Sequence, residues 1–283
     1  MRLLLLCLSL VLSSAHANDR FKDVVITTEH LGGGIHMLTG SGGNIGVSTG
    51  ADGLLIIDDQ FAPLAERISD TLKTLSPNPV KYVLNTHYHG DHTGGNAHFA
   101  DTATIFAHDN VRMRLLDDAN LTPKHLPVVT YSDGITFHFN DETIRVQHLA
   151  NGHTDGDSVV RFEKAKVIHM GDLFFNGHFP YVDLDAGGSV TGYLNNVSSI
   201  IATLDDQTKI IPGHGKLATL EELKKFQKML LDSIVWAKKQ PKDADVAQWQ
   251  SAFPASLTEW SWRFITTERW VETLYRDRQR IHD

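Results

Sequence analysis

The chain has 283 residues, which suits one large domain or a domain with an appendage. Hydrophobic residues make up 41% and charged residues 21%, as in ordinary globular proteins. The net charge is −8. Because an acidic surface repels polyanions, this charge argues against a nucleic-acid partner.

The first 17 residues have the pattern of a signal peptide. Arg2 supplies the positive start, residues 3–12 form an apolar run, and residues 15–17 are the small-residue cleavage pattern Ala-His-Ala. We therefore expect cleavage after Ala17 and a periplasmic or secreted protein. The apolar run is too short for a stable anchor, so no stable membrane insertion is expected. Cys7 is the only cysteine, which leaves the mature chain without a disulfide.

The region after the signal peptide predicts an alternation of short strands and helices. Glycine-bounded runs of β-branched residues predict strands, and apolar residues at helical spacing predict helices. The predicted strands cover residues 23–29, 34–40, 44–50, 53–59, 80–84, 103–108, 134–139, 143–150, 158–163, 166–172 and 208–211, and the predicted helices cover residues 61–75, 109–119, 189–204 and 219–240.

The C-terminal region differs in composition from the rest of the chain. Residues 241–283 contain four of the five tryptophans. Thr267 is expected to cap a last helix that carries Trp270 and Leu274 on one face. We interpret residues 18–240 as one domain and residues 241–283 as a helical appendage that packs on it; the alternative is that residues 241–283 form a surface for a partner protein.

One short segment, LNTHYHGDHTGGN at residues 84–96, holds many side chains that can bind a metal. His87 and His89 are two residues apart on backbone expected to be extended, so both side chains point to one face. After Gly90 turns the chain, Asp91 and His92 are placed to reach a second ion. Imidazole and carboxylate ligands suit zinc and related divalent ions.

Three later segments offer further ligands of the same kind. His153, Asp172 and His214 each follow a predicted strand and lie next to a glycine, which lets the backbone approach closely. An isolated histidine such as His98 is interpreted as an ordinary surface or core residue. The ordered pattern H-x-H-x-D-H, G-H, G-D and G-H is much more specific, and it predicts a metal centre.

This pattern resembles the ligand set of the metallo-β-lactamase superfamily, from about Val24 to the helix that follows His214. The resemblance implies an α+β four-layer αββα sandwich with the metals at the edge between the two sheets. The resemblance implies that the first metal is held by His87, His89 and His153. It implies that the second metal is held by Asp91, His92 and His214, and that Asp172 bridges both metals. Asp58 matches an early aspartate of the family that orients the histidine segment.

The resemblance implies a metal-dependent hydrolase with two zinc ions, with iron or manganese as alternatives. A metal pair lowers the pKa of bound water to about 7 and polarises a carbonyl oxygen. We therefore expect a bridging hydroxide, oriented by Asp91, to cleave an amide, ester or thioester bond in a small-molecule acyl substrate. The oligomeric state is left open.

The substrate is only partly restricted by the sequence. Asp172 stands where the best-known β-lactamases of the superfamily have cysteine or serine, and Phe175 stands where those with cysteine have lysine. The aspartate is shared by hydroxyacylglutathione hydrolases, lactonases and general hydrolases. The expected export argues against the first of these, while the acidic charge argues against transfer-RNA processing. β-Lactams, lactones and thioesters stay open.

Two different functions are the alternatives to hydrolysis. One is a persulfide dioxygenase with a single iron, and the other is a non-catalytic periplasmic metal-binding protein. The flavin-linked iron branch of the superfamily is disfavoured because it has glutamate in place of His89.

Residues 174–189 are expected to form a loop over the metals, because this Gly-rich aromatic segment directly follows Asp172. Phe175, His178 and Phe179 are candidates for the substrate wall. Tyr181 is a catalytic candidate that donates a hydrogen bond to a developing oxyanion. The alternative is that these aromatic residues only anchor the loop on the core.

Overall fold

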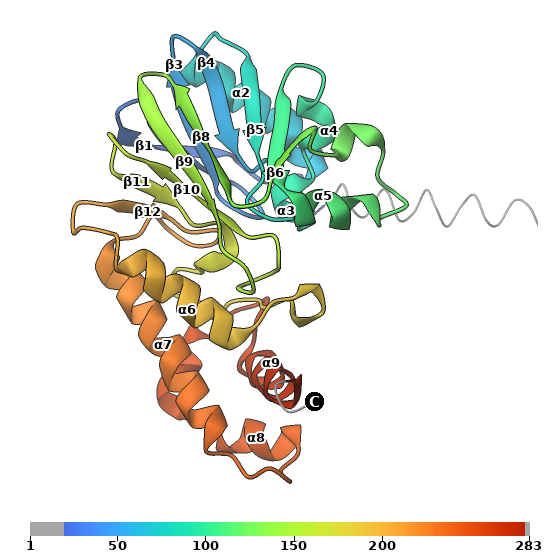
Figure 1. Ribbon diagram of the computed structural model, residues 1–283, viewed down its shortest axis with the longest axis vertical. Coiled ribbons are helices and arrows are strands. Elements are labelled where there is room, and N and C mark those ends of the chain that lie inside the picture. Colours follow the sequence, from blue (N-terminus) through green and yellow to red (C-terminus); the bar gives the residue numbers. More distant parts are fainter. Residues whose placement is uncertain (1–19, 281–283) are drawn as a thin grey trace, which may run out of the picture.

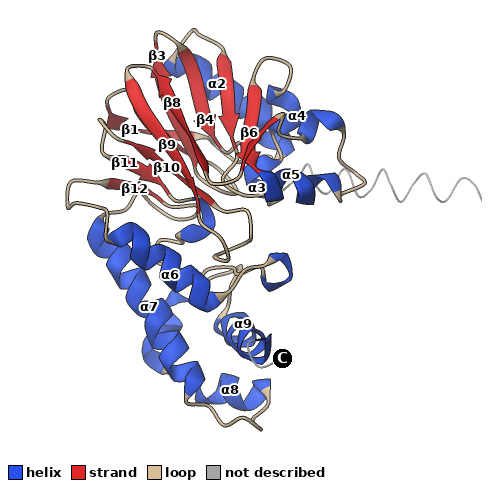
Figure 2. Ribbon diagram, in the orientation of Figure 1, coloured by secondary structure: helices blue, strands red, loops and turns tan. Residues whose placement is uncertain are grey.

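The computed structural model describes residues 20–280, so the predicted signal peptide lies outside the described residues. Two β-sheets are stacked face to face, and helices cover the outer side of each sheet (Figures 1 and 2). This is the four-layer α+β sandwich that the sequence predicts, and the fold prediction is confirmed. Among residues 20–280, no helix has both the length and the apolar character needed to cross a bilayer.

The first sheet has seven strands in the order in which they occur along the chain. They are β1 (Thr27–Gly32), β2 (Ile35–Thr39), β3 (Ile45–Gly50), β4 (Gly53–Ile57), β5 (Val80–Leu84), β6 (Thr104–His108) and β7 (Val129–Tyr131). Strands β1 to β4 pair antiparallel, and β4 to β7 pair parallel through crossover connections. These connections contain α2 (Ala65–Leu75), α3 (Gly90–Thr93), α4 (Asn96–Phe99) and α5 (Asp109–Leu116).

The second sheet has five strands in the order β12-β11-β10-β9-β8. They are β8 (Gly134–Phe139), β9 (Glu142–His148), β10 (Ser158–Phe162), β11 (Val167–His169) and β12 (Lys209–Ile211). Strands β8 to β11 pair antiparallel, and β12 pairs parallel with β11. The parallel pair requires a crossover, which α6 (Val190–Ile201) provides on the outer face of this sheet.

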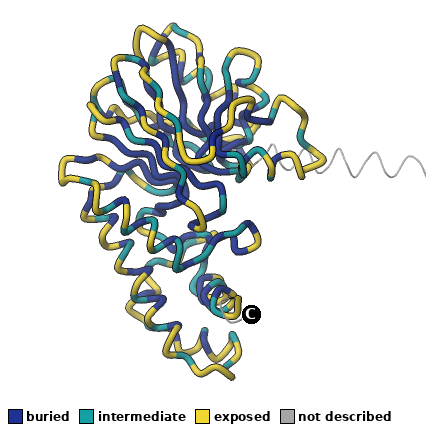
Figure 3. Tube along the Cα trace, viewed as in Figure 1, coloured by how far each residue is buried: buried dark blue, intermediate teal, exposed yellow. Residues whose placement is uncertain are grey.

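Side-chain alternation in the strands explains the layers. In β4, Leu55 and Ile57 belong to the core between the sheets, while Leu54 and Ile56 belong to the core beneath α2. Successive side chains of a strand point to opposite faces, so a strand covered on both faces is apolar throughout. The buried residues accordingly lie along the strands (Figure 3).

The C-terminal helices join the third core, on the outer side of the second sheet. They are α7 (Leu220–Lys238), α8 (Val246–Ala252) and α9 (Thr267–Arg280). Trp249 and Trp270 are almost fully buried in the cluster that also contains α6 and α7. The appendage therefore packs on the domain. Thr267 is the first residue of α9 and not its cap; the preceding Thr266 hydroxyl accepts a hydrogen bond from the Arg269 amide.

Candidate metal centre

The candidate ligands converge because of strand direction. They follow β5, β9, β11 and β12. Strands β11 and β12 are parallel, and β9 has the same direction because both pair antiparallel with β10. The C-terminal ends of these strands therefore meet at one edge of the second sheet. The two sheets are joined at this edge, where the Asn44 amide donates a 2.8 Å hydrogen bond to the Gly213 carbonyl.

The histidine segment differs in local conformation from the prediction. His87 lies in a bend after β5 and not on extended backbone. His89 is extended, with φ −63° and ψ 146°, and it immediately precedes the short helix α3. Asp91 and His92 lie within α3. The bend and the helix together turn the four side chains toward one centre.

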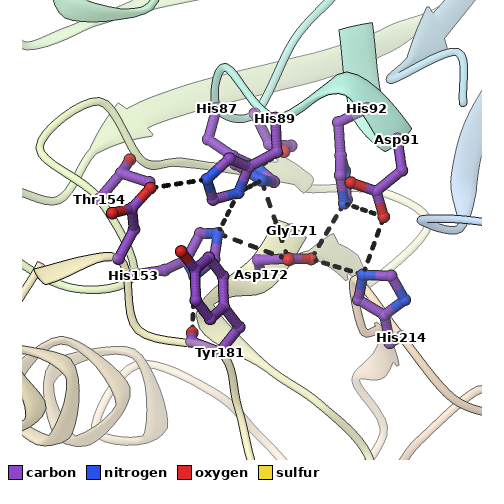
Figure 4. A network of polar contacts seen from close by, with 12 residues as sticks. His87, His89, Asp91, His92, His153, Thr154, Gly171, Asp172, Tyr181 and His214 are labelled. Atoms are coloured by element: carbon purple, nitrogen blue, oxygen red, sulfur yellow. Dashed lines mark hydrogen bonds and ion pairs between the residues drawn. The ribbon is translucent and has the colours of Figure 1, made fainter. Parts of the chain in front are cut away.

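The seven predicted ligands form two adjacent groups (Figure 4). One group contains His87, His89, His153 and Asp172, and the other contains Asp91, His92 and His214. In the first group, His89 Nδ1 is 3.1 Å from His87 Nε2 and 2.8 Å from His153 Nε2. Three nitrogens that face one point at this spacing form one side of a tetrahedral site.

Asp172 lies between the two groups. Its Oδ2 is 3.5 Å from His153 Nε2 and 3.8 Å from His87 Nε2. Its Oδ1 is 3.1 Å from His92 Nε2 and 3.3 Å from His214 Nε2. The carboxylate thus presents one oxygen to each group, which is the arrangement of a bridging ligand.

Asp58 orients His92 of the second group through a hydrogen bond. Its Oδ2 accepts a 2.7 Å hydrogen bond from His92 Nδ1, so His92 Nε2 is directed at the centre. The same carboxylate accepts hydrogen bonds from the amide and the hydroxyl of Thr86, at 2.7 and 2.8 Å. Asp58 therefore holds both the histidine and the start of the segment, as the resemblance implies.

Two further acceptors orient the first group; the sequence analysis named Tyr181 only for its hydroxyl and missed Asp183. His153 Nδ1 donates to the backbone carbonyl of Tyr181 at 2.7 Å. His89 Nε2 donates to Asp183 Oδ2 at 3.0 Å, and the Tyr88 hydroxyl donates to the same oxygen at 2.6 Å. In the sequence, the only signal for Asp183 is its place in the loop that follows Asp172.

Unpaired buried atoms show that this set fits metal ions. His92 Nε2 and Asp172 Oδ1 are buried, and although they lie 3.1 Å apart, neither makes a hydrogen bond within the described residues. Buried polar atoms are normally paired, and a cation that both atoms ligate removes the penalty. Two glycines permit the close approach: a Cβ at Gly213 would lie 2.1 Å from Asp172 Oδ1, and one at Gly43 would lie 2.2 Å from the His92 ring.

The electrostatics of the centre favour neutral ligands in the first group. Burial lowers the pKa of His153 to about 3 and lowers the pKa of His87 well below its usual value. Burial also disfavours a charged His92, but the carboxylates of Asp172 and Asp58 outweigh it and raise the pKa of His92 well above its usual value. A metal at the second group must therefore displace a proton from His92.

The centre is open to solvent on one side. The exposed fractions of the side chains of His89, Asp91 and His214 are 18%, 23% and 16%, whereas that of Asp172 is 4%. A substrate must approach across these three residues.

The aromatic residues predicted to form the substrate wall occupy different positions. Phe175 is buried and stacks on the His214 ring, and Phe179 is fully buried against Trp270. Neither can offer its face to a substrate in this conformation; they pack beneath the site. Tyr181 is half-buried, and its ring centre lies 5.5 Å from that of His89.

The predicted wall residue His178 and two aromatic residues of the C-terminal segment lie beside the centre. His178 stacks on Trp262 with ring centres 4.8 Å apart. Trp262 lies 6.0 Å from the His214 ring, and Phe264 lies 5.9 Å from the Tyr181 ring. The sequence analysis placed the last two in a helical appendage, because nothing local indicates that this segment folds back to the metals.

The comparisons with known proteins agree with this geometry. A family model described as the Metallo-beta-lactamase superfamily matches residues 38–214, which include every candidate ligand. An uncharacterized protein of Mycobacterium leprae is 30% identical over 201 residues, which cover 64% of this chain and 88% of that protein. Acyl-coenzyme A thioesterase MBLAC2 of Gallus gallus is 25% identical over 171 residues, which cover 52% of this chain and 60% of that protein.

Solved structures share the fold. A metallo-beta-lactamase from Pontibacter korlensis matches with a TM-score of 0.64 at 17% identity, and the match covers 73% of this chain and 99% of that chain. At this identity the likeness concerns the architecture and not the substrate. Because the family model spans more than half of the sequence and the fold agrees, the chain belongs to the metallo-beta-lactamase superfamily.

Proposed function

We propose that this protein is an exported dinuclear zinc hydrolase that cleaves an acyl bond, with a thioester or ester as its preferred substrate. The observation that carries the proposal is the position of Asp172, which presents one oxygen to each of two complete ligand groups. The export rests on the N-terminal sequence pattern. The thioester preference is supported by the thioesterase among the relatives.

The residues present have defined tasks in this reaction. His87, His89 and His153 would hold the first ion, and Asp91, His92 and His214 would hold the second, with Asp172 available to both. When bound, the zinc pair supplies Lewis-acid polarisation of the acyl oxygen and lowers the pKa of water.

Asp91 is the group that handles the proton of the attacking water. Its carboxylate is 3.4 Å from His214 Nε2 and remains partly open to solvent, so one oxygen is available to accept a hydrogen bond from water. In that position it orients the water and receives its proton.

Tyr181 is the candidate donor to the acyl oxygen. Burial and the Asp183 carboxylate raise the pKa of the Tyr181 hydroxyl, so this group keeps its proton at neutral pH and remains a donor. Tyr181→Phe removes only the hydroxyl. We expect kcat/KM to fall about tenfold or more on the best substrate, and an unchanged value would exclude this role.

The test uses metal-stripped protein that is reloaded with zinc and assayed on an acyl-CoA thioester, a simple lactone and nitrocefin. We expect about two zinc ions per chain by elemental analysis, and hydrolysis of the thioester. Active protein that contains one iron and no zinc as purified, before the metal is stripped, would favour the dioxygenase. Absence of hydrolysis of all three substrates by the zinc-loaded protein would favour the metal-binding protein.

A further inference from the structure

The open side of the metal centre is bordered by three aromatic rings, those of Tyr181, Phe264 and Trp262, which we call the aromatic strip. Tyr181 lies beside His89 of the first group, and Trp262 lies beside His214 of the second. Phe264 joins the two, with ring centres 5.9 Å from Tyr181 and 5.7 Å from Trp262. The strip thus extends from one metal position to the other on the side where the ligands are exposed.

The strip combines two segments that are far apart in the sequence. Tyr181 belongs to the loop after Asp172, and the other two rings belong to residues 261–266, between the 3₁₀ helix Ala255–Trp260 and α9. The segments are joined reciprocally at one residue: the Phe179 amide donates to the Trp260 carbonyl at 2.7 Å, and Trp262 Nε1 donates to the Phe179 carbonyl at 3.0 Å. These bonds fix the position of Trp262 relative to the metals.

Ile265, and not Phe264, is the buried residue at this point of the segment. Ile265 is 2% exposed and provides the buried contact, whereas Phe264 is 45% exposed. Few large apolar side chains of the described chain are so exposed. The ring is nevertheless held in place, because the Arg269 guanidinium lies 5.0 Å from its centre and also donates to the Phe264 carbonyl. An ordered, exposed aromatic ring beside a reactive centre is suited to ligand contact.

We infer that the aromatic strip binds the apolar chain of the acyl group and makes the enzyme selective for medium-chain over short-chain acyl thioesters. This inference rests on the proposed acyl-hydrolase function. An acetyl group placed at the metals is too short to cover the strip, whereas a chain of eight carbons can contact more than one ring. Each buried methylene adds to the affinity, so the gain grows with the length of the chain.

The test compares octanoyl-CoA with acetyl-CoA in the zinc-loaded wild type and in Phe264→Ala. We expect the wild type to prefer octanoyl-CoA. In Phe264→Ala, the ratio of the two kcat/KM values should fall about tenfold, through KM for octanoyl-CoA, as expected for loss of a buried apolar contact. The kcat/KM for acetyl-CoA should fall less than that for octanoyl-CoA, because the acetyl group is too short to cover the strip. Leu231→Ala, at an exposed apolar position of α7, is the matched control.

A binding measurement separates this inference from the proposed function. The thioethers S-octyl-CoA and S-ethyl-CoA cannot be hydrolysed, and their affinities are measured by calorimetry. Preference for S-octyl-CoA that Phe264→Ala abolishes supports the strip even if no thioester is hydrolysed. An unchanged octanoyl-to-acetyl ratio in Phe264→Ala, or equal affinity of the wild type for both thioethers, overturns the inference even if hydrolysis is observed.

Discussion

Asp183 is predicted to control zinc affinity at the first group without touching the metal. Its Oδ2 accepts hydrogen bonds from His89 at 3.0 Å and Tyr88 at 2.6 Å, and its Oδ1 accepts one from the Ala186 amide at 3.1 Å. Both oxygens act only as acceptors. Burial disfavours the ionised form, but the bonds from His89 and Tyr88 outweigh it and lower the pKa of Asp183, which keeps the carboxylate charged.

The substitution Asp183→Asn tests this role with the smallest change in shape. An amide has one acceptor, so in either orientation its NH₂ group faces a donor. His89 then loses the neighbouring negative charge in both orientations and its hydrogen bond in one of them, and Nδ1 is less firmly directed at the metal. We expect zinc affinity at the first group to fall about 10- to 100-fold, which corresponds to about 1.4–2.7 kcal/mol.

The measurement is a competition titration of metal-free protein with a chromophoric zinc chelator, which resolves the two binding steps. Asp185→Asn is the control, because this neighbouring carboxylate is 80% exposed and its ion-pair partner among the described residues is Arg276, at 3.0 Å. The control should bind zinc like the wild type. A first-site affinity within about twofold of wild type in Asp183→Asn would refute the reasoning. Equal weakening of both sites would indicate a collapsed loop and would also refute it.

Three further predictions concern the second group and the appendage. The kcat of zinc-saturated Asp91→Asn should fall about 10²–10⁴-fold. The control His98→Gln, at an exposed position, should leave kcat nearly unchanged. Near-normal turnover of metal-loaded Asp91→Asn would contradict the role of Asp91 in accepting the proton of the water. Because the pKa of His92 is raised, zinc binding at neutral pH should release about one proton from it and weaken as pH falls. Calorimetry in buffers of different ionisation enthalpy checks this, and no buffer dependence would contradict it. Trp270→Ala should lower the free energy of unfolding in denaturant by about 3–5 kcal/mol, because Trp270 is fully buried and donates a hydrogen bond to Ser233. A decrease in the free energy of unfolding below about 1 kcal/mol would contradict the packing of the appendage.

The sequence, through its resemblance to the metallo-β-lactamase superfamily, was sufficient for the layers and for the grouping of the candidate ligands. Each ligand follows a strand, and strands such as β4 are marked by continuous apolar residues between glycines. The prediction that the ligands follow strands remains correct when the predicted bounds of a single strand are wrong by a few residues. This is the case for β1, which was predicted at residues 23–29 and lies at Thr27–Gly32. The position of His87 in a bend did not alter the grouping, because Gly90 and α3 still turn Asp91 and His92 to the second side.

The tertiary structure alone decided what supports and borders the centre. Asp183 and His89 are 94 residues apart in the sequence, and Trp262 and Phe179 are 83 apart. No local pattern specifies such contacts. The position of Trp262 depends on how α7 and α9 pack on the second sheet and return the chain to the metal edge, and that of Asp183 depends on the path of the loop after Asp172. The same packing moved Phe175 and Phe179 from the expected substrate wall into the core and put Phe264 at the opening. The sequence does not distinguish an aromatic residue in the core from one at the opening of the site. The surfaces that pack around the side chain in the folded protein determine whether it is buried.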